Sequence, residues 1–254
     1  MNVLTAVLLV LSVLSSPASS IAEESPEPKP ALITTYEEDV TGDGQKETIE
    51  LKGVLFSEDT NYYRDIWVDI SSPHGEEWKI SYGGGYEPEI QFVDVTHDDV
   101  NDLLYQSATG GSGGLYNYQL HTLKGGNLSK IPLPEQPHVR GEFQENFQVK
   151  LHIFPNHPAI SLNVEDRKED YIRLGIYNEE GRLLERTQVM VDPIAFFEPV
   201  LISESKGYGL KSYRQISGAY HADQLGTIET LWYYEDDEWI ILQTDWVPSA
   251  PPAE

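Results

Sequence analysis

Apolar and polar residues alternate with a period of two through most of this 254-residue chain, and that pattern limits what the chain can fold into. Successive side chains of an extended strand point to opposite faces, so the pattern is typical of strands with one buried face. The segments with the clearest alternation are Thr48–Val54, Asp65–Ile70, Trp78–Tyr82, Tyr116–Leu120 and Tyr171–Ile176. No stretch of a dozen residues has a convincing period of 3.6. We therefore predict an all-β protein built from antiparallel hairpins.

Turn-forming residues separate these segments. Asn178–Gly181, Lys124–Asn127 and Glu235–Glu238 each lie between two strand-like runs. Gly, Asn and Asp favour the tight turns of hairpins. The chain is thus expected to be a meander, with the acidic segment Glu235–Glu238 as a solvated hairpin tip.

The two ends and one internal segment divide the chain. Residues 1–22 combine an apolar run with small residues before Ala22, which predicts a signal peptide and export; a buried N-terminal strand is the alternative. The Pro-rich acidic spacer 23–30, the connection 132–138 and the tail 248–254 enclose two β regions. These regions, 31–131 and 139–247, are either two domains or two sheets of one domain.

Charge and cysteine content exclude several classes of function. The chain has 42 acidic and 17 basic residues, a formal charge of −25. This balance argues against binding nucleic acid or an anionic membrane surface. The chain has no cysteine, which excludes disulfides, thiol catalysis and a lipid-anchored Cys. We expect a secreted or envelope monomer whose partner is an unidentified protein or glycan.

An acidic loop in the first β region has the spacing of a calcium site. It places oxygen side chains at positions 1, 3, 5 and 9, glycine at position 6, and a residue whose carbonyl can bind at position 7. Calcium prefers six to eight hard oxygen ligands, and glycine permits the sharp turn. The predicted ligands are Asp39, Thr41, Asp43, Gln45 and Glu47, with Glu50 at position 12 as a secondary candidate.

A second copy of this loop follows 55 residues later. Both copies begin Asp-Val-Thr and run into an apolar strand. The corresponding predicted ligands are Asp94, Thr96, Asp98, Val100 and Asp102. Two copies in register are stronger support than one. The alternative is that both are ordinary Asp-rich turns, which form without metal.

These residues carry a family resemblance. The loop Asp39–Glu47 with its following strand resembles the FG-GAP/VCBS repeats of secreted and cell-surface β-propellers, over residues 31–123 at most. The resemblance implies a propeller-like or incomplete propeller assembly, calcium at the loops, and adhesion, binding or scaffold roles. The second copy departs from the pattern at His97 and Asp99, where the family prefers glycine. Two packed β-sheet domains are the alternative architecture.

No complete catalytic set is recognisable. Gly110–Gly114 fits G-x-S-x-G, but a strand pattern follows it where a nucleophile elbow requires a helix. The leading hypothesis is an exported, non-enzymatic calcium-binding protein that acts as a binding or scaffold module. A carbohydrate-binding or carbohydrate-active protein is the alternative, because the chain holds 15 Tyr and 5 Trp and pairs such as Tyr116 with Tyr118 and Trp232 with Tyr234 share strand faces. An acidic accessory domain that mimics another polyanion is the third.

Overall fold

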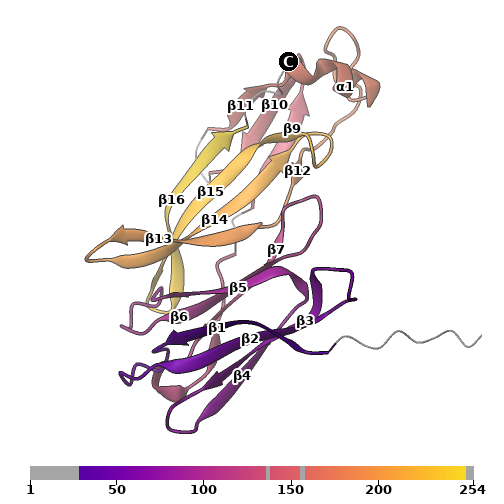
Figure 1. Ribbon diagram of the computed structural model, residues 1–254. Helices are drawn as coiled ribbons and strands as arrows, with labels where there is room; N and C mark the ends of the chain where they lie inside the picture. The colour runs from indigo at the N-terminus through magenta and orange to yellow at the C-terminus, as the bar shows by residue number, and fades with distance from the viewer. Residues whose placement is uncertain (1–28, 136–137, 155–157, 250–254) are drawn as a thin grey trace, which may run out of the picture.

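The computed structural model describes residues 29–135, 138–154 and 158–249, so the predicted signal peptide lies outside the described residues. Three antiparallel sheets account for most of this chain, and the all-β prediction is confirmed (Figure 1). In these ranges, no helix is long and apolar enough to cross a membrane.

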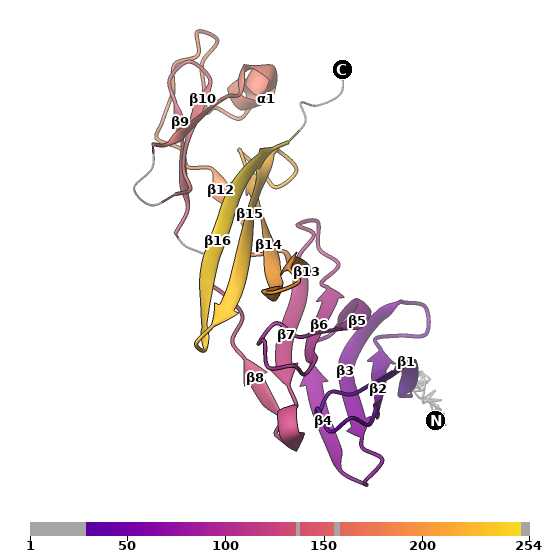
Figure 2. The ribbon, with the colours of Figure 1, turned by 90° about the vertical axis from the view of Figure 1, so that its left-hand side faces the viewer.

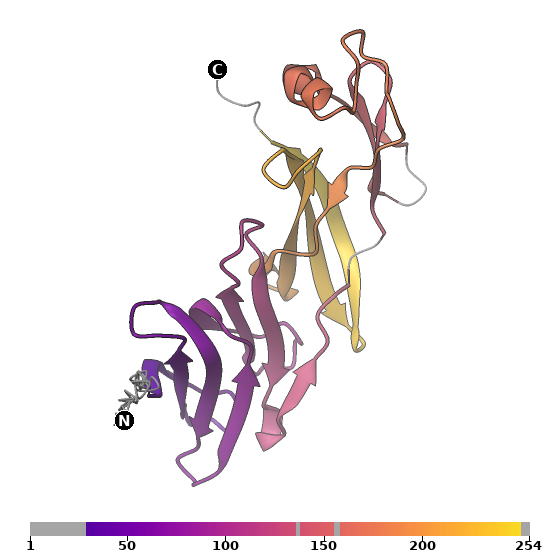
Figure 3. The same ribbon diagram turned by 90° about the vertical axis from the view of Figure 1, so that its right-hand side faces the viewer.

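The first sheet has eight strands in the order β1-β2-β3-β5-β6-β7-β8, with β4 paired to β3. Its strands are β1 (Ala31–Glu38), β2 (Glu47–Leu55), β3 (Tyr62–Ser71), β4 (Glu77–Tyr82), β5 (Gly85–Val93), β6 (Asp102–Ala108), β7 (Tyr116–Thr122) and β8 (Ser129–Ile131), and the short turn η1 (Lys124–Gly126) joins the last two. The sheet curls on itself (Figure 3) and buries alternate residues such as Ile49, Leu51 and Val68 on its inner face. The alternation predicted in β2 therefore appears as alternate burial, whereas β6 is buried on both faces.

The remaining strands form two smaller sheets. The second sheet has the order β11-β10-β9, and the third has the order β12-β14-β15-β16 with β13 paired to β14. Their strands are β9 (Arg140–Gln144), β10 (Gln148–His152), β11 (Ile160–Asn163), β12 (Met190–Val191), β13 (Phe196–Ser203), β14 (Gly207–Ser217), β15 (Gln224–Glu235) and β16 (Glu238–Pro248). The third sheet lies between the other two along an elongated molecule (Figure 2).

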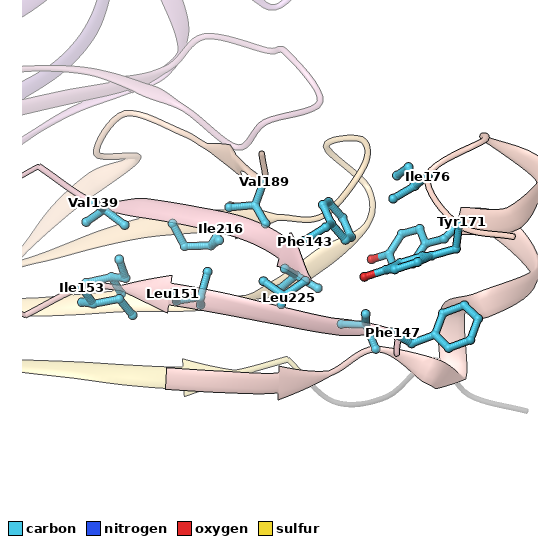
Figure 4. Close-up of a cluster of buried hydrophobic side chains, with 14 residues drawn as sticks. Val139, Phe143, Phe147, Leu151, Ile153, Tyr171, Ile176, Val189, Ile216 and Leu225 are labelled. Atoms are coloured by element: carbon cyan, nitrogen blue, oxygen red, sulfur yellow. The ribbon is translucent and has the colours of Figure 1, made fainter. Parts of the chain in front are cut away.

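The third sheet contributes to two hydrophobic cores. At one end Ile216 and Leu225 pack with Phe143 and Leu151 of the second sheet (Figure 4). At the other end a separate cluster joins the third sheet to the first, and its largest members are Leu104, Leu120, Phe197, Leu210 and Trp232. Burial of large apolar side chains is worth about 1.5–3 kcal/mol each. The third sheet is therefore the part that holds the molecule together.

The strand predicted at Tyr171–Ile176 is wrong: its first half is the end of the short helix α1 (Lys168–Arg173), which follows the 3₁₀ turn η2 (Glu165–Arg167), and its second half is a turn. The N–H of Leu174 bonds the carbonyl of Asp170, and Gly175 with φ of +74° ends the helix. Six alternating residues are too few to separate a strand from one helical turn. Tyr171 alone of the helix is buried.

A pH-dependent stability is expected from His121 on β7. Its side chain is only 6% exposed. Burial, with Lys130 across the sheet, lowers the pKa of the imidazole to about 4. The unfolded state binds the proton at a pKa near 6.5 and the folded state does not, so stability falls as pH drops from about 6.5 to 4. The expected loss is on the order of 3 kcal/mol.

Urea unfolding of the wild type and of His121→Leu at pH 7, 5 and 4 measures this contribution. The difference in unfolding free energy between the two should shift across this window, whereas the exposed His152→Gln should track the wild type. Parallel pH profiles for His121→Leu and the wild type would contradict the prediction.

Candidate functional site

The two acidic loops lie at the same end of the first sheet. The loop 39–46 joins β1 to β2, and the loop 94–101 joins β5 to β6. The side-chain amide of Asn101 donates to the carboxylate of Glu38 over 2.9 Å. The N–H of Gly125, in the β7–β8 turn, donates to the carbonyl of Thr41 over 2.8 Å. The structure thus brings together the loops that the sequence repeat predicted.

The acidic residue at position 9 closes each loop from inside the protein. Glu47 is fully buried, and its carboxylate accepts the N–H groups of Val40 (3.0 Å) and Thr41 (3.3 Å) and the hydroxyl of Thr41 (3.2 Å). A buried carboxylate is tolerated when several donors satisfy it. Glu47 therefore fixes the backbone at the start of its own loop.

Asp102 repeats this arrangement in the second loop. It is fully buried and accepts the N–H groups of Val95 (3.0 Å) and Thr96 (3.1 Å) together with the Thr96 hydroxyl (3.1 Å). Burial raises the pKa of the Asp102 carboxyl to about 6, and the bonds from Val95 and Thr96 oppose that rise. The one-carbon difference between Glu and Asp does not change the pattern.

The acidic residue at position 1 caps each turn. Asp39 accepts the N–H groups of Gly42 (2.7 Å) and Gly44 (2.8 Å) through separate oxygens. Asp94 also accepts two loop N–H groups, those of Asp98 (3.1 Å) and Asp99 (3.0 Å), so the donor at position 6 is shared and the other donor moves from position 4 to position 5.

The acidic residue at position 5 makes the same local bond in both copies. Asp43 accepts the N–H of Gln45 (2.7 Å), and Asp98 accepts the N–H of Val100 (3.1 Å). With the caps at position 1 and the buried carboxylates at position 9, the sequence repeat is also a repeat in three dimensions.

The second loop keeps the backbone of the first without its glycines. Gly42 and Gly44 have φ of +77° and +86°, and their counterparts His97 and Asp99 have φ of +60° and +66°. Such values are uncommon for residues other than glycine, although His and Asp adopt them more readily than most. The departure from the family pattern therefore leaves the loop conformation unchanged.

His97 docks the second loop on the third sheet. Its Nδ1 lies 3.0 Å from the carbonyl of Tyr234, its Nε2 lies 2.8 Å from the carbonyl of Tyr208, and its ring stacks on Tyr233 with centroids 4.4 Å apart. The corresponding Gly42 packs against the second loop instead, where a Cβ would lie 2.6 Å from a methyl of Val100. The same loop position thus makes two different contacts.

The oxygen atoms of the first loop suit a hard cation in part. An ionised carboxylate offers about four acceptor sites, and Asp39 uses two of them on backbone N–H groups. Asp43 is also bonded once and lies 3.7 Å from His74. Glu47 and the hydroxyl of Thr41 are turned toward each other. In the part of the chain that the structure describes, no three His or carboxylate side chains converge as a ligand cluster.

A lysine occupies the neighbourhood of the second loop. The ammonium of Lys124 donates to the carbonyl of Asp98 over 2.7 Å and lies 3.4 Å from its carboxylate. A fixed positive charge at this distance competes with a bound cation. The second loop therefore has a positive charge beside it, although its backbone conformation is similar to that of the first loop.

The other motifs singled out in the sequence are packed or lack the required context. Gly110–Gly114 precedes β7, a strand, so it is not a nucleophile elbow. Trp232 is 3% exposed and donates its indole N–H to Ser212. Tyr118 packs edge-on against Phe197. These aromatic residues contribute to the core between the first and third sheets.

One polar cluster was not foreseen from the sequence. Asp223 is buried and accepts the hydroxyl of Tyr171 (2.7 Å) and the N–H of Ala219 (2.8 Å), and Arg167 lies 3.5 Å away. These residues line or adjoin a hollow of about 280 Å³ beside α1. Gly218 leaves room for the side chains of Asp223 and Tyr171, since a Cβ at this position would lie 2.1 Å from the Asp223 carboxylate. Arg167 and Tyr171 are about 50 residues from Asp223 in the sequence, so no local sequence motif predicts the cluster.

Comparisons with known proteins place the chain near one family. A model of the YybI C-terminal domain matches residues 137–247, which is less than half of the chain. The uncharacterized protein YybI of Bacillus subtilis (strain 168) is 26% identical over 208 residues, 79% of each chain.

Solved structures are more remote. A Bacillus licheniformis rhamnogalacturonan lyase is 14% identical with a TM-score of 0.36, and the exotype rhamnogalacturonan lyase YesX is 14% identical with a TM-score of 0.37. Each is matched over 85% of this chain, and the chain spans about a third of their length (34% and 33%). Likeness at this level carries no functional argument.

The contacts of His97 predict a role in stability. His97→Gly keeps the left-handed backbone and removes the stacking on Tyr233 and the contacts of the ring nitrogens with the carbonyls of Tyr234 and Tyr208, to one of which a neutral imidazole donates. We expect a loss of about 1–2 kcal/mol, because relief at a positive φ offsets part of the lost contacts. Denaturant unfolding measures it, with His74→Ala, at an exposed position of the β3–β4 turn, as the control expected to change stability by less than about 0.5 kcal/mol. Equal stability of His97→Gly and wild type would show that the docking contributes nothing.

Proposed function

We propose that this protein is an exported, non-enzymatic β protein that binds calcium at its first acidic loop and acts as a binding or scaffold module outside the cell or in the cell envelope. The observation that carries the proposal is the pair of loops at one end of the first sheet, whose hydrogen bonds agree except for one donor to the first carboxylate of each loop. The resemblance of Asp39–Glu47 to FG-GAP/VCBS calcium loops supports the same role.

The first loop is the better cation site of the two. Asp39 and Asp43 present carboxylates at the exposed tip, where Gly42 and Gly44 supply the tight turn. The formal charge of −25 favours cation binding at the surface in general. Extracellular calcium modules bind at about 10⁻⁴–10⁻³ M, and a loop with few free carboxylate oxygens fits that range.

A calcium titration followed by thermal unfolding tests the proposal. At about ten times the dissociation constant, binding adds about 1.4 kcal/mol, which raises the melting temperature by roughly 3–6 °C for a chain of this size. Asp43→Asn should abolish the rise, and Asp236→Asn on the β15–β16 tip should retain it. Magnesium at the same concentration should have a smaller effect. A flat melting temperature up to about 10 mM calcium, or an unchanged rise in Asp43→Asn, would refute calcium binding at this loop.

Removing the lysine beside the second loop should reveal a second site. Lys124→Gln takes away the ammonium near Asp98 and leaves the backbone of the loop in place. Isothermal titration should then count two calcium ions per chain where the wild type binds one, and Asp98→Asn in the Lys124→Gln background should return the count to one. The same count in wild type and Lys124→Gln would show that the lysine does not compete with calcium.

A further inference from the structure

β16 is the outer strand of the third sheet. It pairs with β15 from Glu238 to Pro248, and no strand of the described chain pairs with its other side. It runs along the outside of the molecule (Figures 1 and 2). An edge strand of eleven residues offers a row of backbone N–H and C=O groups to another chain.

The apolar content of this edge is unusual for a surface. Ile240, Ile241 and Leu242 are consecutive and 38–46% exposed, and Val247 is 42% exposed. The pairing with β15 shifts at this point, because Trp232 pairs with Ile241 and Leu231 pairs with Gln243, so Leu242 forms a bulge. Three consecutive exposed apolar residues in a strand are a defect unless they have a function.

Several other outer strands carry protections that natural edges use, although β1, with eight residues and no Lys, Arg or Pro, has only a bulge and two acidic residues. β8 has three residues and β11 has four, and β13 contains Pro199, which cannot donate to a ladder. β16 has no Lys or Arg, and its one proline is its last residue. Its own protections are the bulge and two acidic residues, Glu238 and Asp245.

The charged residues of β16 itself and of the β15–β16 tip are all acidic. Glu238 and Asp245 are exposed on the strand, and the adjoining tip adds Glu235, Asp236 and Asp237. Lys206 approaches Glu235 to 4.0 Å. A second copy of a chain with a charge of −25 is repelled from this edge, whereas a cationic chain is attracted to it.

We propose that the β16 edge binds an extended segment of a cationic polypeptide as an added strand. Backbone hydrogen bonds would hold the segment. Glu238 and Ile240 share a face of β16, so on that face the segment would place a Lys or Arg near Glu238 and an apolar side chain over Ile240, next to the bulge at Leu242. This inference rests on the binding role proposed above and is independent of calcium.

The test uses a fluorescent nine-residue peptide that carries Lys and Val in turn on one face of the strand and Thr at the intervening positions, titrated with the purified protein and followed by anisotropy. We expect saturable binding that Leu242→Lys weakens at least about tenfold. Leu201→Lys is the matched control, because Leu201 is 51% exposed on β13 and the charge change is the same; it should alter the affinity less than about twofold. The same peptide with every backbone nitrogen methylated should not bind.

Each other outcome overturns the inference. Equal weakening in both variants would indicate attraction to the whole acidic surface, and binding of the methylated peptide would exclude an added strand. A dimer in light scattering that Leu242→Lys makes monomeric would assign the edge to a second copy. Titrations in calcium and in EDTA separate the two proposals, since loss of calcium binding alone leaves the effect of Leu242→Lys intact.

Discussion

The first sheet depends on a buried carboxylate at the start of a strand. Glu47 opens β2 and Asp102 opens β6, and each binds two backbone N–H groups of the loop before it. A buried N–H left without a partner costs about 1–3 kcal/mol, so each carboxylate strongly favours one loop conformation. The registers agree, since Glu38 pairs with Glu47 and Val93 pairs with Asp102, both at the loop end of a hairpin. Two hairpins 55 residues apart thus close in the same way.

The two loops have similar backbones but different surroundings, and those surroundings separate their roles. The first loop is near solvent and His74, whereas the second lies between Lys124 and the third sheet. The residue at position 4, Gly42 in the first loop and His97 in the second, shows how the contacts differ. Gly42 lets the first loop approach Val100, and His97 carries the contacts to β14 and β15. The repeat therefore supplies one cation candidate and one joint between sheets.

The sequence predicted what is local. Period two predicted the strands, and the shared Asp-Val-Thr start predicted a shared loop, because carboxylates and hydroxyls bind nearby backbone groups wherever this order of residues occurs. It did not predict the inward turn of Glu47, or that His97 would reach Tyr234, 137 residues later. It also gave a strand where α1 forms, since Tyr171 is fixed by the distant Asp223. Contacts of long sequence separation leave no periodic signal.

The buried carboxylates also limit what calcium could do here. In a helix–loop–helix calcium site the last acidic residue binds the ion with both oxygens. Glu47 spends three acceptor sites on the backbone and hydroxyl of Val40 and Thr41, so about one remains. On the proposed function, Asp39, Asp43, the carbonyl of Gln45 and water would supply most of the coordination. Calcium would then stabilise a loop that is already closed, so a weak site would be enough and the sheet would fold without the ion.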